Sequence, residues 1–176
     1  ISLMESALNK VKSVFGGKYK IGLKTYENSD FILNYPAKLS LTESSGKIVL
    51  EHQIPYKNSG DCDMKSGSES FNYLTDFKVS FEIFNGTVKQ AVLKNSPYMP
   101  SENYAGDTLK ISPGFIDSYQ IGNFSGFAIL EGAEGCGRVI YYFPVSDGKV
   151  LIVDRANIQA LSSIIIKEKR DEVLAV

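Results

Sequence analysis

The chain has no tryptophan, one histidine and two cysteines among its 176 residues. His52 and two cysteines far apart in the sequence do not give the short ligand spacing of a zinc site. The segment 122–126 (GNFSG) places its serine one position too late for the G-x-S-x-G nucleophile turn of hydrolases. These scarcities leave no motif for a metal centre or a serine nucleophile, and we expect no cofactor.

The chain also lacks a net excess of positive or negative charge and any long apolar run. The formal net charge is −1, from 19 basic and 20 acidic residues, without a basic cluster that would favour nucleic-acid binding. No apolar run approaches the roughly 20 residues needed to cross a bilayer, so we expect no transmembrane segment. The first residue is isoleucine, and we expect that a signal peptide or lipid anchor has been removed.

Tyrosine and phenylalanine are abundant instead, with ten of each. These residues favour the half-buried surface of a β-sheet. The length and the 43% hydrophobic content fit one globular domain covering residues 1–176.

The clearest pattern lies between Gly114 and Arg155. Four runs rich in β-branched and aromatic residues are separated by turn residues, which is typical of antiparallel hairpins. The runs are Phe115–Ile121, Phe124–Glu131, Arg138–Pro144 and Lys149–Arg155. This spacing predicts a four-stranded C-terminal meander.

The preceding residues predict two more hairpins and a further strand. The expected strands are Tyr19–Tyr26, Asp30–Tyr35, Leu39–Leu41, Lys47–Gln53 and Lys78–Phe84. Apolar residues at helical spacing predict helices over residues 1–15, Thr87–Lys94 and 156–176, and a short helix or turn over Ser70–Phe77. The acidic segment Pro55–Ser70 departs from a calcium-binding loop, so we expect an exposed loop. The fold class is therefore α+β: a central antiparallel sheet of six or seven strands flanked by N-terminal, middle and C-terminal helices.

The irregular segment from Asn95 to Asp107 is the candidate contact loop. It combines aromatic and polar side chains: Tyr98, Met99, Glu102, Asn103, Tyr104 and Asp107. Such a loop suits a carbohydrate or peptide ligand. It equally suits a loop that pins itself to the sheet through its tyrosines, which is the interpretation we favour.

The two cysteines, Cys62 and Cys136, are candidates for a disulfide. The bridge would close a loop of about 70 residues and stabilise the fold by about 4 kcal/mol in the chain-entropy model. Two free thiols remain the alternative. A third reading makes one cysteine a nucleophile with His52 as its base.

Several segments resemble the PsbP/Mog1 family, in particular its secreted or lipid-anchored bacterial members. They are the aromatic strand FILNYP at 31–36, Gly126-Phe127 in a late strand, and YYFP at 141–144 before a turn and a closing strand. The resemblance implies an antiparallel sheet flanked by helices and an extracytoplasmic, accessory role. The metal-linked histidines of the plant photosystem members have no counterpart, since His52 is the only histidine.

We therefore expect a non-catalytic, extracytoplasmic accessory or binding domain of bacterial type. Its partner would be a protein or a cell-surface ligand. The alternative is a hydrolase or thiol enzyme using Cys136 or Cys62 with His52.

Overall fold

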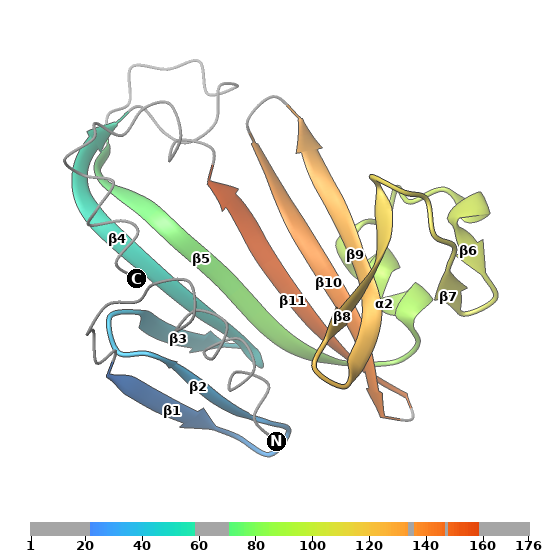
Figure 1. The fold of residues 1–176 in the computed structure, drawn as a ribbon, viewed down its shortest axis with the longest axis horizontal. Helices are drawn as coiled ribbons and strands as arrows, with labels where there is room; N and C mark the ends of the chain where they lie inside the picture. The colour runs from blue at the N-terminus through green and yellow to red at the C-terminus, as the bar shows by residue number, and fades with distance from the viewer. Residues whose placement is uncertain (1–21, 59–70, 134–135, 147, 159–176) are drawn as a thin grey trace.

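A seven-stranded antiparallel sheet organises the molecule (Figure 1). The computed structural model describes residues 22–58, 71–133, 136–146 and 148–158. The helix expected over residues 1–15 and the segments 59–70 and 159–176 lie outside the described residues.

The strands of this sheet follow the order β3-β4-β5-β11-β10-β9-β8. Their bounds are Ser40–Ser44 (β3), Lys47–Asn58 (β4), Phe71–Asn85 (β5), Ile116–Ile121 (β8), Phe124–Ala133 (β9), Cys136–Ser146 (β10) and Lys149–Ile158 (β11). A separate hairpin pairs β1 (Leu23–Glu27) with β2 (Ile32–Pro36), and a small one pairs β6 (Tyr104–Ala105) with β7 (Thr108–Leu109).

The predicted C-terminal meander is confirmed as β8, β9, β10 and β11, which pair antiparallel in sequence. Ile121 pairs with Phe124 across a two-residue turn. Gly122 has φ +56° there, a left-handed conformation that glycine adopts without steric cost. The two early hairpins, β1–β2 and β3–β4, are also confirmed.

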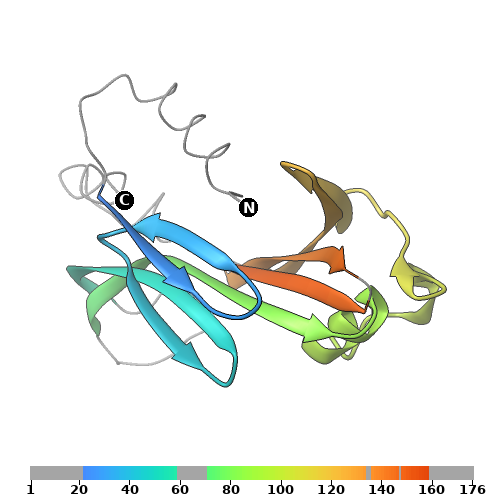
Figure 2. The same ribbon diagram turned by 90° about the horizontal axis from the view of Figure 1, so that it is seen from below.

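Two elements cover diagonally opposite parts of the sheet (Figure 2). The helix α2 (Val88–Asn95) packs on one face, here called the helix face, above strands β5 and β8–β11. The β1–β2 hairpin packs on the other, the hairpin face, above strands β3–β5 and β11. Each element closes its own hydrophobic core.

The core of the helix face contains the larger set of fully buried side chains. It includes Val92 of α2 and the sheet residues Ile116, Ile129, Ile140, Tyr142 and Val150. The core of the hairpin face centres on Leu33, Tyr35, Leu39, Leu50 and Val79. Both are built from alternate positions of the strands, as the period of two requires.

The middle helix is confirmed, and its first turn has a capping box. The Thr87 hydroxyl accepts from the Gln90 amide, while the Gln90 side chain accepts from the Thr87 amide. Within the described residues α2 is the only α-helix, joined by the 3₁₀ turn Ser101–Asn103. The described fold is therefore mostly β, and the expectation of several flanking helices is wrong for these residues.

Three expected boundaries are also wrong. Residues 71–77 belong to β5, not to a helix or turn, because pairing with β4 satisfies their backbone. For the same reason Pro55–Asn58 continue β4, where a loop was expected. Residues 156–158 extend β11 through pairing with β10, where a helix was expected to begin.

Candidate functional site

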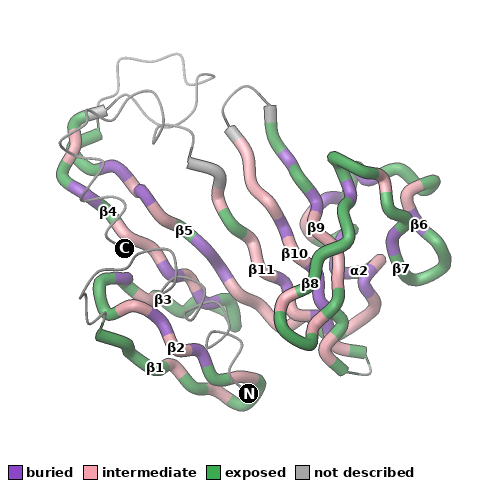
Figure 3. Tube along the Cα trace, viewed as in Figure 1, coloured by how far each residue is buried: buried purple, intermediate pink, exposed green. Residues whose placement is uncertain are grey.

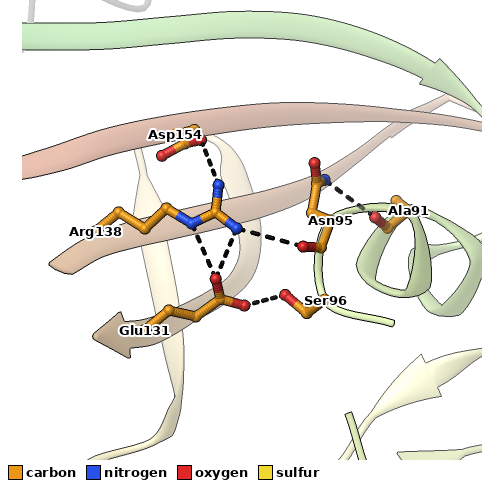
Figure 4. Close-up of polar contacts among 6 residues, drawn as sticks. All are labelled: Ala91, Asn95, Ser96, Glu131, Arg138 and Asp154. Atoms are coloured by element: carbon orange, nitrogen blue, oxygen red, sulfur yellow. Dashed lines mark hydrogen bonds and ion pairs between the residues drawn. The ribbon is translucent and has the colours of Figure 1, made fainter. Parts of the chain in front are cut away.

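A cluster of charged side chains lies where the end of α2 meets the sheet (Figure 4). The charged cluster consists of Glu131 on β9, Arg138 on β10 and Asp154 on β11. Arg138 Nε and Nη2 bond Glu131 Oε2 at 2.9 and 2.8 Å, and Arg138 Nη1 donates to Asp154 Oδ2 at 3.1 Å. One guanidinium thus joins three adjacent strands.

The same cluster holds the end of α2. Arg138 Nη2 donates to the carbonyl oxygen of Asn95 at 3.3 Å, and the Ser96 hydroxyl donates to Glu131 Oε1. The Asn95 side chain donates to the carbonyl oxygen of Ala91 at 3.2 Å. These contacts satisfy polar groups at the helix C-terminus, which would otherwise be left without partners.

Burial and charge act in opposite directions on the guanidinium. Burial alone would lower the pKa of Arg138, but the hydrogen bond to Glu131 and the charges of Asp154 and Glu131 outweigh it, so the pKa is raised. Burial also strongly raises the pKa of Tyr142, whose hydroxyl is buried without a hydrogen-bond partner in the described residues. The raised pKa of Arg138 keeps its guanidinium positively charged beside the two carboxylates.

Tyr98 lies beside this cluster and is 68% exposed. Burial of its hydroxyl end, followed by the charge of Glu131, raises the pKa of Tyr98. The ring thus faces solvent while its hydroxyl end lies close to the charged cluster. This arrangement makes Tyr98 the most accessible aromatic side chain in the predicted contact loop.

The structure divides the six predicted loop residues into two groups. Met99 and Tyr104 are buried in the core of the helix face, so of the two tyrosines that the pinning interpretation invokes, Tyr104 packs inward and Tyr98 does not. Asn103 is half-buried and donates from Nδ2 to Met99 Sδ at 3.2 Å. Tyr98, Glu102 and Asp107 are exposed. The loop is therefore anchored by its centre and presents Tyr98 to solvent.

His52 has a specific partner on the neighbouring strand. Its Nδ1 lies 2.7 Å and 2.9 Å from the two carboxylate oxygens of Asp76. The Asp76 side chain is fully buried, whereas that of His52 is 19% exposed. Asp76 is an extra residue in β5, opposite the shift in register between His52 and Gln53. The pair fixes the ring and leaves Nε2 as its remaining polar atom.

The side chains of Cys62 and Cys136 lie outside the described residues, so the disulfide and the thiol-enzyme arrangement stay predictions. Within the described part of the chain, no three His, Cys, Asp or Glu side chains form a metal-binding group. No helix there has the length and hydropathy to cross a membrane.

Sequence patterns alone did not identify the charged cluster, because its members lie on three strands and meet only through the strand register. A signal was present in the strand alternation. Glu131 follows Ile129 by two positions, and Arg138 precedes Ile140 by two, so each shares a buried face with an isoleucine. A charged residue at such a position requires a partner of opposite charge.

Comparison with known proteins adds no relationship: neither a protein-family model nor a curated protein sequence matches the chain.

Proposed function

We propose that the chain is a non-catalytic, extracytoplasmic binding domain that contacts a saccharide or peptide ligand through Tyr98. The observation that carries the proposal is the exposed Tyr98 ring, held on a loop whose neighbouring residues Met99 and Tyr104 are buried. A rigid exposed aromatic ring loses little conformational freedom on binding and offers a large contact area.

The charged cluster supports a binding role more than a catalytic one. The Ser96 hydroxyl is fully buried and already donates to Glu131. The carboxylates of Glu131 and Asp154 both accept from Arg138. Because the Ser96 hydroxyl and the two carboxylates are already hydrogen-bonded to each other or to Arg138, they hold the loop in its conformation. The extracytoplasmic setting is inferred from the resemblance described above.

The test is a titration of isotope-labelled protein with panels of soluble oligosaccharides and short peptides, followed through backbone amide shifts. We expect a binding probe to shift residues 95–107, and Tyr98→Ala to weaken its affinity by about tenfold, a typical loss for a truncated aromatic contact. Tyr98→Phe should retain most of the affinity. Tyr73→Ala removes another exposed tyrosine, 61% accessible on β5, and serves as the matched control. Binding that shifts other residues and ignores Tyr98→Ala would contradict the proposal.

The His52–Asp76 pair favours one second candidate, a thiol enzyme. A histidine oriented by a buried carboxylate has the arrangement of a general base in nucleophilic catalysis. In this reading His52 would activate Cys62 or Cys136.

Counting thiols separates the two candidates. Two titratable thiols under denaturing, non-reducing conditions, one of them reacting at least several-fold faster than the other in the native protein, would favour the enzyme. His52→Ala should then abolish the rate difference. No titratable thiol would show that both cysteines are bonded and would exclude a cysteine nucleophile.

A further inference from the structure

The strand β8 forms one edge of the seven-stranded sheet, with β9 as its neighbour on one side (Figure 1). The Leu130 amide donates to the carbonyl oxygen of Phe115 at 3.2 Å, which fixes the phase of the β8–β9 ladder. Because hydrogen-bonded and non-hydrogen-bonded pairs alternate along antiparallel strands, Asp117 and Tyr119 bond β9 through their backbone. The backbone N–H and C=O groups of Ser118 and Gln120 consequently point away from the sheet.

Only a short part of this edge is open among the described residues. Ile116 also points outward, but it exchanges two backbone hydrogen bonds with Ser112, at 2.7 and 2.9 Å. Ser118 and Gln120 have no such backbone partner in the described part of the chain. Here called the β8 edge, these two residues present their amide donors and carbonyl acceptors at the spacing of a β-ladder. That arrangement pairs readily with another extended segment.

Exposed apolar side chains gather beside the β8 edge. Phe115, Tyr119 and Leu130 are 37%, 42% and 50% exposed. The register places them on the hairpin face, and β8 is exposed along most of its length (Figure 3). The Tyr141 ring centroid lies 4.6 Å from that of Tyr119 and supports the exposed ring. An open edge flanked by exposed apolar side chains is usually paired or protected in natural sheets.

β8 lacks the features that protect an edge strand. It contains no lysine or proline, and it pairs with β9 without a bulge. Its one charged residue, Asp117, is exposed on the hairpin face and accepts from the Gly114 amide through Oδ1 at 3.0 Å. Arg155 lies on the same face, but on β11, three strand spacings or about 14 Å away along the sheet. Asp117 therefore places a negative charge at the edge that a basic ligand side chain would complement.

We propose that the β8 edge binds an extended, basic peptide segment of a partner protein by β-strand addition. An antiparallel segment exchanges two hydrogen bonds with Ser118 and two with Gln120. Its residue opposite Tyr119 points to the hairpin face and contacts the exposed ring. The residue opposite Asp117 lies on the same face, where a lysine or arginine meets the carboxylate. The backbone bonds supply the affinity, and these two positions supply the selectivity.

A second copy of the chain fits the edge less well. Pairing β8 with β8 would bring no cation to Asp117, because the strand carries neither lysine nor arginine. The contact would be limited to a few residues, whereas a stable protein interface buries about 800 Å² per partner. The edge is also distinct from the proposed ligand contact, since Tyr98 adjoins Glu131 on the helix face. Either site can therefore fail its test without affecting the other.

The test combines isotope-labelled full chain with a capped pentapeptide, Val-Thr-Phe-Thr-Lys. When its threonines pair with Ser118 and Gln120, its phenylalanine lies opposite Tyr119 and its lysine opposite Asp117. In the free protein, we expect the amides of Ser118 and Gln120 to exchange with solvent at least several-fold faster than those of Asp117 and Tyr119. At millimolar peptide, the two fast amides should shift and slow several-fold, because they then donate to the peptide.

Two pairs of variants and ligands isolate the backbone and the charge. Gln120→Pro removes an outward amide at an edge position where proline is tolerated, and should abolish binding, whereas Gln120→Ala keeps the amide and should bind normally. The peptide with glutamate in place of lysine should bind several-fold more weakly at low salt. Asp117→Asn keeps the acceptor for Gly114 and should remove that preference. Circular dichroism checks each fold, and if Gln120→Pro is unfolded, the exchange pattern and Asp117→Asn decide.

Three outcomes would overturn the proposal. Equal protection of all four amides in the free protein would show that the β8 edge is already paired. Absence of peptide-induced shifts at Ser118 and Gln120, or unchanged binding by folded Gln120→Pro, would show that the edge does not add a strand. Protection that rises with protein concentration without peptide, together with a dimer mass in sedimentation, would assign the edge to a second copy.

Discussion

At the scale of single residues, Arg138 joins three strands and the end of α2 through its guanidinium. It pairs with Glu131 and Asp154 and bonds the carbonyl oxygen of Asn95. Glu131 is nearly buried, so it cannot recover water if the guanidinium is removed. Arg138 thus supplies the positive charge that compensates the buried carboxylate of Glu131.

We expect Arg138→Met to lower the free energy of unfolding by about 2 to 3 kcal/mol, less than for a fully buried pair because the guanidinium is partly exposed. Asp154→Asn should cost under about 1 kcal/mol, since it removes one more exposed contact. Urea denaturation measures both. The double variant Arg138→Met with Glu131→Met should recover part of the loss; equal losses for Arg138→Met and Asp154→Asn would contradict this account.

Gly126 gives the sharpest steric prediction. A Cβ atom there would lie 2.2 Å from the Tyr142 carbonyl oxygen and 2.8 Å from Phe143 Cδ1. We expect Gly126→Ala to destabilise the protein by about 1 to 3 kcal/mol, as overpacking does. At Gly22 the nearest atom would be 3.6 Å away, so Gly22→Ala should change stability by under about 0.5 kcal/mol. Thermal unfolding of the two variants compares them directly.

At the scale of elements, strand alternation and turn residues predicted the meander because both signals coincide there. They failed at residues 71–77, where Leu74 and Phe77 are spaced three apart as in a helix. The long-range pairing of β5 with β4 overrides that local pattern. The loop was predicted to pin itself through its tyrosines; Tyr104 is buried in this way, whereas Tyr98 is exposed. The contact of Ser96 with Glu131 depends on which strands become neighbours, and short-range sequence patterns do not specify that.

The start of α2 depends on Thr87. We expect Thr87→Ala to cost about 1 kcal/mol in stability, because the Gln90 amide would lose its acceptor. Thr87→Ser keeps that acceptor and should cost much less. Chemical denaturation checks the difference, and equal stability of the two variants would show that the capping box contributes little.

At the scale of the whole molecule, a contact between distant segments ties the β1–β2 hairpin to the sheet. Lys149, at the start of β11, donates to Asp30 Oδ1 at 2.8 Å. This bond is the main cause that lowers the pKa of Asp30 from its ordinary value of 3.8. A carboxylate whose pKa is lower in the folded state stabilises the fold above pH 3.8, and that contribution is lost as the pH falls through the lowered pKa.

We expect Lys149→Met to return the pKa of Asp30 toward 3.8 and to remove this part of the acid sensitivity. A carboxyl chemical-shift titration by NMR measures the midpoint directly. Lys47→Met, which removes a lysine on β4, is the control. An unchanged Asp30 midpoint in Lys149→Met would mean that the contact does not form in solution.

The diagonal placement of hairpin and helix has a consequence for how the protein opens. The helix and the hairpin each cover a different part of the sheet, and among the described strands only β5 and β11 contribute side chains to both hydrophobic cores. The part of the sheet under α2 can therefore unfold locally while the part under the β1–β2 hairpin stays folded, and the reverse. In native-state hydrogen exchange, we expect amides of β1–β3 and of β8 to exchange through two separate partial openings, and the central spine formed by β5 and β11 to be released last.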